Sequence, residues 1–133
     1  LETINEKISF KKLIKLKRCI AIADGFYEWK RTENKKKPFF FQREDKKIIY
    51  FAGIYDENEF CLITEQASEN VLEIHHRQPV ILNQKDLKSY LNLQLDGSAF
   101  LKKAKKPRLE FYEVSKDVNK PTNNSISLIQ KLN

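Results

Sequence analysis

The chain of 133 residues contains no methionine, three glycines, four prolines and two cysteines, and it has no long hydrophobic run. Because a bilayer span needs about 20 consecutive apolar residues, the sequence excludes a transmembrane helix and we expect no membrane partner. Residues 1–7 do not have the basic and apolar regions of a signal peptide, so we expect a cytoplasmic protein.

Cysteine and histidine are too sparse for a metal centre. Cys19 and Cys61 lie in apolar, strand-like segments, and no C-x-x-C or H-x-x-x-H spacing exists. Zinc sites need such spacings, so we expect no metal and no cofactor. Two buried, reduced thiols are a better interpretation than a disulfide in a reducing compartment.

Positive charge is in excess. The chain has 25 lysines and arginines against 18 aspartates and glutamates, which gives a net charge of +7. This balance makes a polyanion a plausible partner, although lysine-rich faces are also often only solvated surface. Hydrophobic residues (41%) and charged residues (32%) are in ordinary globular proportion, so residues 1–133 suit one domain, expected to be a monomer.

The order of apolar segments predicts an α+β fold. Strands are expected at residues 19–23, 26–29, 38–42, 48–55, 60–64, 80–82 and 109–114. Helices are expected at residues 3–17 with Thr3 as the cap, at residues 67–75 and from Asn83 onward. The lysine-rich segments 31–37 and 102–108 are expected to be connections. We predict a strongly curved antiparallel sheet or partly closed β-barrel, with a meander in the first half, a bulge or a sharp bend at Gly53 and flanking helices.

The stretch 18–30, RCIAIADGFYEWK, is the first candidate site. A buried strand ends at Asp24-Gly25, and an extended segment then places Phe26 and Glu28 on one face and Tyr27 and Trp29 on the other. Desolvation by neighbouring rings disfavours a charged carboxylate, which would suit Glu28 to proton transfer. The alternative is that Glu28 only pairs with an arginine at a strand end.

His75 and His76, the only histidines, precede Arg77 and form the second candidate site. An imidazole exchanges protons near neutral pH, and a guanidinium binds phosphate with two parallel hydrogen bonds. A purely structural role for these groups at a helix C-terminus is the alternative.

Several motifs, in the right order, resemble the SRAP domain, the SOS response-associated peptidase family. Residues 18–29 are similar to its RC-x-x-P-A-D-G-F/Y-Y-E-W signature, and residues 74–82 to its I-H-D-R-M-P-V-I-L. The remaining matches are Glu2-Thr3, Lys37-Pro38-Phe39, 52–55, 60–67, Val118-Asn119 and 123–125. Departures from the family pattern are Ala21 for Pro, His76 for Asp, Gln78 for Met, Asn124 for Asp and Ile126 for Pro.

The resemblance implies binding to abasic sites in single-stranded DNA, in the cytoplasm near the nucleoid. It implies that an N-terminal cysteine, exposed by autoproteolytic removal of the initiator Met, forms a covalent thiazolidine crosslink with the sugar. That cysteine, and an active-site asparagine, would precede Leu1, so we expect this stretch to be an inactive fragment carrying the second part of the site.

The resemblance also implies roles for residues within the chain. Glu28 and His75 would be catalytic. Thr64, Arg77, Trp29 and Lys37 would contact DNA. The alternatives are a non-catalytic basic nucleic-acid-binding module and a lysine-rich structural domain with no nucleic-acid role.

Overall fold

The computed structural model describes residues 7–133, with side chains from Phe10 onward. The cap predicted at Thr3 and the Glu2-Thr3 motif lie outside these residues. The chain forms two compact units, each built from three segments. Of the described residues, the first unit contains 7–23, 49–65 and 79–107, and the second contains 24–48, 66–78 and 108–133.

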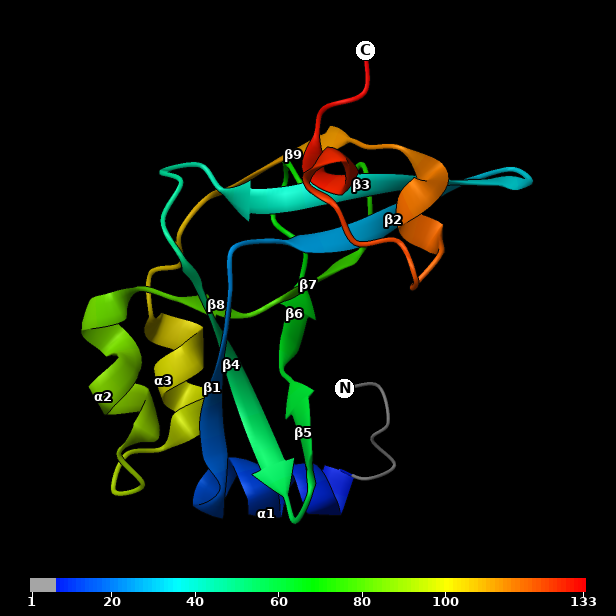
Figure 1. The fold of residues 1–133 in the computed structure, drawn as a ribbon. Coiled ribbons are helices and arrows are strands. Elements are labelled where there is room, and N and C mark those ends of the chain that lie inside the picture. Colours follow the sequence, from blue (N-terminus) through cyan, green and yellow to red (C-terminus); the bar gives the residue numbers. More distant parts are fainter. Residues whose placement is uncertain (1–6) are drawn as a thin grey trace. The chain divides into compact units, whose positions relative to one another are not determined.

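The first unit combines a four-stranded antiparallel sheet with short helices (Figure 1). Its strands follow the order β1-β4-β5, and β8 also pairs with β4. The elements are α1 (Lys7–Leu16), β1 (Arg18–Ala23), β4 (Ile49–Asp56), β5 (Glu59–Leu62), β8 (Ile81–Leu82), η2 (Gln84–Asp86), α2 (Leu87–Leu91) and α3 (Gly97–Lys103).

Apolar side chains from the helices and the sheet form the core of this unit, because each element buries one face. The core contains Ile14, Ala52, Ile54, Ile63, Val80, Leu82, Tyr90 and Leu101. Tyr90 is fully buried, and its hydroxyl donates to the carbonyl oxygen of Gly53 at 2.7 Å. None of the helices within residues 7–133 is long and apolar enough to cross a bilayer.

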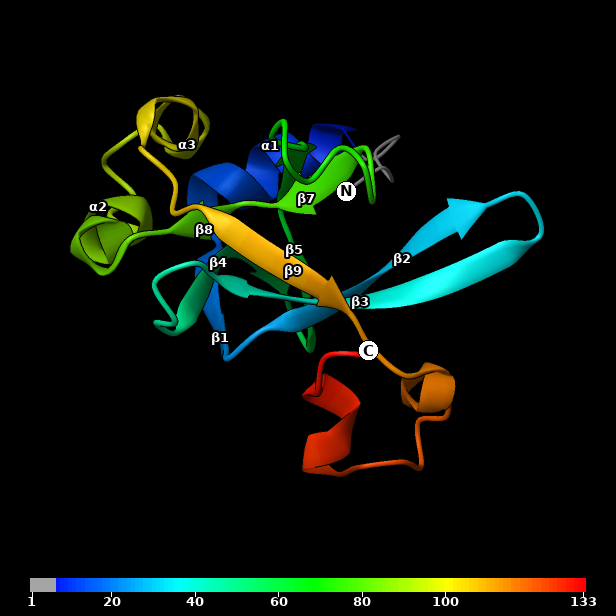
Figure 2. The ribbon, with the colours of Figure 1, turned by 90° about the horizontal axis from the view of Figure 1, so that it is seen from above.

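The second unit is organised around the antiparallel sheet β2-β3-β9. Its elements are β2 (Phe26–Thr32), β3 (Lys35–Arg43), β9 (Leu109–Glu113), η3 (Lys116–Asn119) and η4 (Ile126–Ile129). A separate two-stranded sheet pairs β6 (Thr64–Gln66) with β7 (Arg77–Pro79). Within residues 7–133, β2 pairs only with β3, so β2 is an edge strand of the described sheet, and Figure 2 shows it at the rim.

Both faces of the three-stranded sheet carry aromatic rings. Phe41 stacks on Phe26 with ring centroids 5.0 Å apart and contacts Phe111 at 4.9 Å. On the other face, Phe40 contacts Tyr27 at 5.6 Å and Tyr112 at 5.8 Å. Phe40 and Phe41 are buried, so β3 is covered on both sides and forms the rigid centre of this unit.

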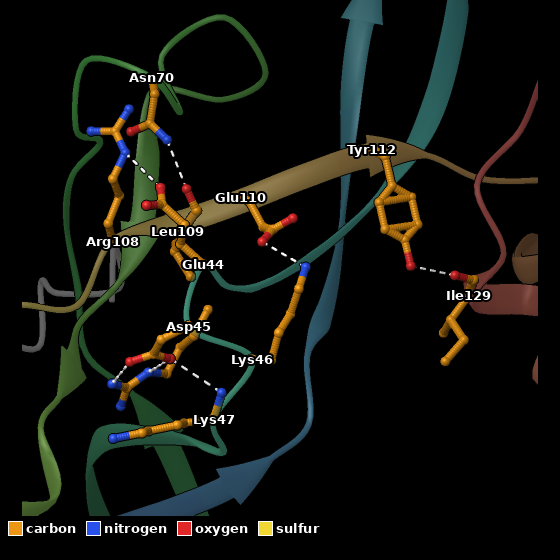
Figure 3. Close-up of polar contacts among 11 residues, drawn as sticks. Glu44, Asp45, Lys46, Lys47, Asn70, Arg108, Leu109, Glu110, Tyr112 and Ile129 are labelled. Atoms are coloured by element: carbon orange, nitrogen blue, oxygen red, sulfur yellow. Dashed lines mark hydrogen bonds and ion pairs between the residues drawn. The ribbon is translucent and has the colours of Figure 1, made fainter.

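Polar contacts connect the ends of β3 and β9 to the surrounding loops (Figure 3). The Asn70 side-chain amide donates to the Leu109 carbonyl at 2.8 Å, and the Tyr112 hydroxyl donates to the Ile129 carbonyl. Arg43 forms two hydrogen bonds with the Asp45 carboxylate, at 2.8 and 2.5 Å. The pKa of Asp45 is lowered, mainly because of these hydrogen bonds.

The prediction of an α+β fold with antiparallel sheets is confirmed, but the described residues 7–133 form separate sheets and no closed barrel. The predicted meander is wrong, because β3 pairs with β2 and β9 while β1 pairs with β4 in another sheet. The predicted bulge at Gly53 is also wrong: Gly53 pairs in unbroken register with Cys19 and Leu62. A Cβ there would approach the Cys19 sulfur to 3.0 Å, so the glycine provides room for its neighbour strands.

Three local predictions fail. The segment 67–75 forms successive turns rather than a helix, with hydrogen bonds from Val71 and Leu72 to the Ser68 carbonyl. The supposed connection 31–37 consists mostly of paired strand. The helical region expected from Asn83 onward is divided into separate helices, and α3 begins at Gly97 because the Asp96 carboxylate accepts from the Ala99 amide.

The two cysteines also differ from the prediction. Both are free, but Cys61 is exposed and only Cys19 is partly buried. The pKa of the Cys19 thiol is raised by burial, whereas the Cys61 side chain of β5 points away from the core.

Candidate functional site

The start of strand β2 is fixed by Gly25. A Cβ at this position would lie 2.3 Å from Cζ of Phe40 and 2.5 Å from the carbonyl oxygen of Phe41. Such contacts are far inside van der Waals separation, so only glycine lets the chain pass this close to β3. The glycine thereby sets the register that places Glu28 opposite Phe39 and Trp29 opposite Pro38.

A pocket of about 380 Å³ lies along the edge strand β2. It is lined by Glu28, Trp29, Arg31, Lys36, His75 and Asn119. All six residues belong to the second unit. Among the described residues β2 pairs only with β3, and side chains from both faces of β2 line the same pocket.

Hydrogen bonds hold the aromatic wall of this pocket. Nε1 of Trp29 donates to Oδ1 of Asn119 at 2.8 Å, which fixes the indole against helix η3. The backbone amide of Trp29 donates to Oε1 of Glu28 at 3.2 Å. This contact gives the Glu28 carboxylate one hydrogen-bond donor from the otherwise unpaired edge of the sheet.

His75 is held by its own chain. Its Nδ1 atom lies 3.1 Å from the backbone amide of Arg77 and 3.1 Å from the carbonyl oxygen of Arg77. The ring stacks on His76 with centroids 4.7 Å apart. Nδ1 can accept from the amide when the ring is neutral or donate to the carbonyl when Nδ1 carries a proton, so Nε2 is the nitrogen left for exchange with a ligand.

The pocket is cationic on one side. Arg31 and Lys36 are directly opposite each other in the β2–β3 register, and both are exposed. Among the side chains described, from residue 10 to residue 133, neither forms an ion pair. A carboxylate, an imidazole, an indole and two unpaired cations therefore share one pocket, which suits an anionic ligand whose chemistry needs proton transfer.

Three of the predicted site residues line this pocket: Glu28, His75 and Trp29. Lys37 does not, because it alternates with Lys36 and lies on the other face of β3. Arg77 follows in β7 without lining the pocket, and Thr64 belongs to the first unit.

Three lining residues were missed: Arg31, Lys36 and Asn119. The sequence contained a signal for Asn119, which lies in a stretch that resembles a family motif. Arg31 and Lys36 lie in the segment predicted to be a connection, where no alternation of side chains between two faces is expected. The alternative prediction of an ion pair between Glu28 and an arginine is wrong for the side chains described in residues 10–133.

The predicted surroundings of Glu28 are correct only in part. Phe26 stacks on Phe41, and Tyr27 and Trp29 lie together with centroids 6.4 Å apart. Glu28 itself is half-buried at the wall of an open pocket rather than enclosed by these rings. Within the described part of the chain, no three histidine, cysteine, aspartate or glutamate side chains are grouped to hold a metal ion.

Comparison with known proteins shows the family. The profile of the family described as SOS response associated peptidase (SRAP) matches residues 1–121. The chain belongs to the SRAP family. The motifs that carry the resemblance include Glu28 and His75, so two of the residues that line the pocket come from SRAP signature segments.

SRAP relatives are found in bacteria and in yeast. Abasic site processing protein YoqW of Bacillus subtilis (strain 168) is 37% identical over 97% of this chain, and the match covers 64% of YoqW. Abasic site processing protein YMR114C of Saccharomyces cerevisiae is 31% identical over 99% of this chain and 40% of its own length. A crystal structure of a Bacteroides thetaiotaomicron protein is similar with a TM-score of 0.83 and 29% identity, over 98% of this chain and 63% of that one.

This SRAP chain thus spans about two thirds or less of the proteins that it matches. The similarity to the Bacteroides protein extends over nearly all of the present chain, so it includes residues of both units.

Proposed function

We propose that the protein containing this chain processes abasic sites in single-stranded DNA, and that the pocket along β2 receives the abasic sugar. Family membership and relatives named as abasic site processing proteins support this function. The observation that carries it is the convergence of Glu28, His75 and two unpaired cations on one pocket. An abasic nucleotide has no base, so a pocket of about 380 Å³ beside an indole suits its sugar and flanking phosphate.

The proposed reaction is attack of an α-amine on the ring-opened sugar aldehyde. The amine adds to the carbonyl carbon, and the adduct loses water to leave an imine. A thiol on the same residue then adds across the C=N bond, its proton passes to nitrogen, and a thiazolidine ring closes. The amine and thiol would belong to a cysteine that precedes Leu1 and is exposed by autoproteolytic removal of the initiator Met.

Glu28 and His75 would move the protons. The amine attacks only in its neutral form, and the leaving hydroxyl needs a proton, so one group must accept a proton and later donate it. Glu28 is suited to this task because its carboxylate lies at the pocket wall. Nε2 of His75 would exchange a proton with the sugar oxygen, since Nδ1 is engaged by the backbone of Arg77.

The remaining residues would hold the DNA. Arg31 and Lys36 would contact a phosphate at the pocket, and Trp29 would stack on a neighbouring base. We keep the proposal that Arg77, Thr64 and Lys37 contact the strand on either side of the abasic nucleotide. The intact protein would act as a monomer in the nucleoid.

The test is the rate of crosslinking to an abasic oligonucleotide by the full-length protein. Glu28→Gln should slow crosslinking by about 10²- to 10⁴-fold, because this is the usual contribution of a general acid–base group. Glu69→Gln is the matched control, since Glu69 is exposed and does not line the pocket. Binding to an intact oligonucleotide should change little in either variant.

A normal crosslinking rate in Glu28→Gln would refute the catalytic role of this residue. If the full-length protein binds single strands but never crosslinks, the chain is a basic nucleic-acid-binding module. Equal crosslinking of single-stranded and duplex abasic substrates would refute the preference for single strands.

A further inference from the structure

The distal part of the β2–β3 hairpin is a two-stranded arm. Strand β9 pairs with β3 only from Phe39 to Arg43, and the Val114 amide donates to the Pro38 carbonyl. Within the described part of the chain, residues 35–37 of β3 therefore pair only with β2. Figures 1 and 2 both show this hairpin extending past β9. We name residues 30–37 the basic arm, because they contain Lys30, Arg31, Lys35, Lys36 and Lys37.

Like charges are directly opposite each other in the basic arm. Lys30 pairs with Lys37, and Arg31 pairs with Lys36. Side chains directly opposite in an antiparallel pair lie on the same face about 4.5–5.5 Å apart at Cβ, and like charges there are destabilising. Two such pairs in succession destabilise the pairing of β2 with β3 in the arm.

Nothing in the described part of the chain neutralises this charge. None of the five cations forms an ion pair with a carboxylate among residues 10–133. The opposite end of β3 differs, because Arg43, Lys46 and Arg108 are each paired with an acidic side chain (Figure 3). The two ends of β3 therefore differ: the cations at one end are paired with acidic side chains, and, among the described side chains, the five cations of the basic arm are not.

The two cation pairs lie on opposite faces of the arm. Strand alternation places Arg31 and Lys36 on one face, where both line the pocket, and Lys30 and Lys37 on the other. Lys35 shares the face of Lys30 and Lys37. Of the hairpin residues that line the pocket, only Glu28 lies on this second face. The three lysines of the second face do not line the pocket.

We propose that Lys30, Lys35 and Lys37 form a second phosphate-binding face, so that the DNA backbone contacts both sides of the basic arm. This proposal rests on the proposed function for the choice of DNA as the polyanion. The pocket-side cations would bind the phosphate beside the abasic sugar, and the second face would bind phosphates further along the same strand. Lysines act as point charges, so this contact is independent of sequence.

The experiment measures binding of the full-length protein to an intact 20-nucleotide oligothymidylate at several salt concentrations. Each phosphate contact on a single strand contributes about 0.7 to the slope of log K against log salt. Lys30→Gln/Lys37→Gln should lower the slope by about 1.4, which is about a 25-fold loss of affinity at about 0.1 M salt. Arg31→Gln/Lys36→Gln should have a similar effect.

Controls separate binding from folding. Lys85→Gln/Lys88→Gln removes the same charge from exposed positions in the first unit and should leave the slope unchanged. Lys30→Gln/Lys37→Gln should raise the melting temperature, because it removes a repulsive pair. Lys30→Arg/Lys37→Arg should restore the wild-type slope.

An unchanged slope in Lys30→Gln/Lys37→Gln, together with a lowered slope in Arg31→Gln/Lys36→Gln, would overturn the second face. The oligothymidylate has no abasic site, so this outcome is independent of the crosslinking rate of Glu28→Gln. A lowered slope in Lys30→Gln/Lys37→Gln together with a normal crosslinking rate in Glu28→Gln would support the second phosphate-binding face and refute the catalytic role of Glu28.

Discussion

Replacing Arg18 should destabilise the first unit more than any surface change. Its side chain is only 6% exposed, and its guanidinium donates to four backbone carbonyls. Nε contacts the Ile14 oxygen at 2.5 Å, Nη1 contacts the Tyr90 and Asn92 oxygens at 2.7 and 3.2 Å, and Nη2 contacts the Leu95 oxygen at 2.6 Å. Arg18 thus connects the ends of α1 and α2 to the loop before α3.

The magnitude follows from these contacts. The bonds to Ile14 and Tyr90 are buried, and both acceptors lie in the last turns of their helices, where a cation is favourable. The other two oxygens are partly buried and can be hydrated. In Arg18→Met, two buried acceptors lose their donor at about 1–3 kcal/mol each, so we expect a loss of about 4 kcal/mol.

Arg18→Lys should lose less, about 2 kcal/mol. An ammonium group keeps the charge, but it cannot reach four carbonyls that are arranged around a planar guanidinium. The assay is urea denaturation followed by circular dichroism and by the fluorescence of Trp29, the only tryptophan, with coincident transitions as the test of two-state unfolding.

Lys12→Met is the control, because Lys12 is exposed on α1 and should change stability by less than about 0.5 kcal/mol. The reasoning would be refuted if Arg18→Met cost less than about 1 kcal/mol, or if Arg18→Lys were as stable as the wild type. Either result would mean that water replaces the guanidinium at the buried carbonyls.

Three further predictions concern single side chains. Burial raises the pKa of Tyr90, so the stability that this neutral hydroxyl contributes should be complete below about pH 10 and lost as the pH rises above it. In urea titrations, Tyr90→Phe should lose less stability at alkaline pH than the wild type. At pH 7 it should cost about 1 kcal/mol, because the hydrogen bond to Gly53 is lost. Gly25→Ala should cost about 3 kcal/mol in the same assay and slow crosslinking, because the new methyl group meets the backbone of β3, and full stability would contradict this. Glu57→Gly should raise the melting temperature, since Glu57 has φ 45°, where a side chain costs about 1–2 kcal/mol, whereas an unchanged or lower value would show that the turn is unstrained.

The sequence predicted those elements whose apolar pattern is local. Strand 18–23 follows a continuous apolar run, and the strand that contains Glu28 follows from the break at Asp24-Gly25. The rest of the hairpin, residues 31–37, could not be predicted, because its lysine-rich strands have no alternation of apolar and polar residues. Its strand structure comes from backbone pairing in register, which single residues do not encode.

The segment before His75 shows the opposite error. Val71 and Ile74 have helical spacing and are buried, but the chain satisfies its hydrogen bonds through turns from Ser68 onward. Apolar spacing therefore identified the buried side chains correctly and the backbone incorrectly. Glu28 and His75 could be found from their motifs, whereas their common pocket depends on contacts between segments far apart in the sequence.

The interleaving of the two units has a consequence for any attempt to divide this protein. The chain passes from one unit to the other after residues 23, 48, 65, 78 and 107. Neither unit can therefore be expressed as one continuous piece, and each closes only after distant segments have met, which slows folding of such topologies. A protease cut after residue 48, 65 or 78 would divide the segments of both units between the two fragments, so cleavage at these connections and inactivation should proceed together.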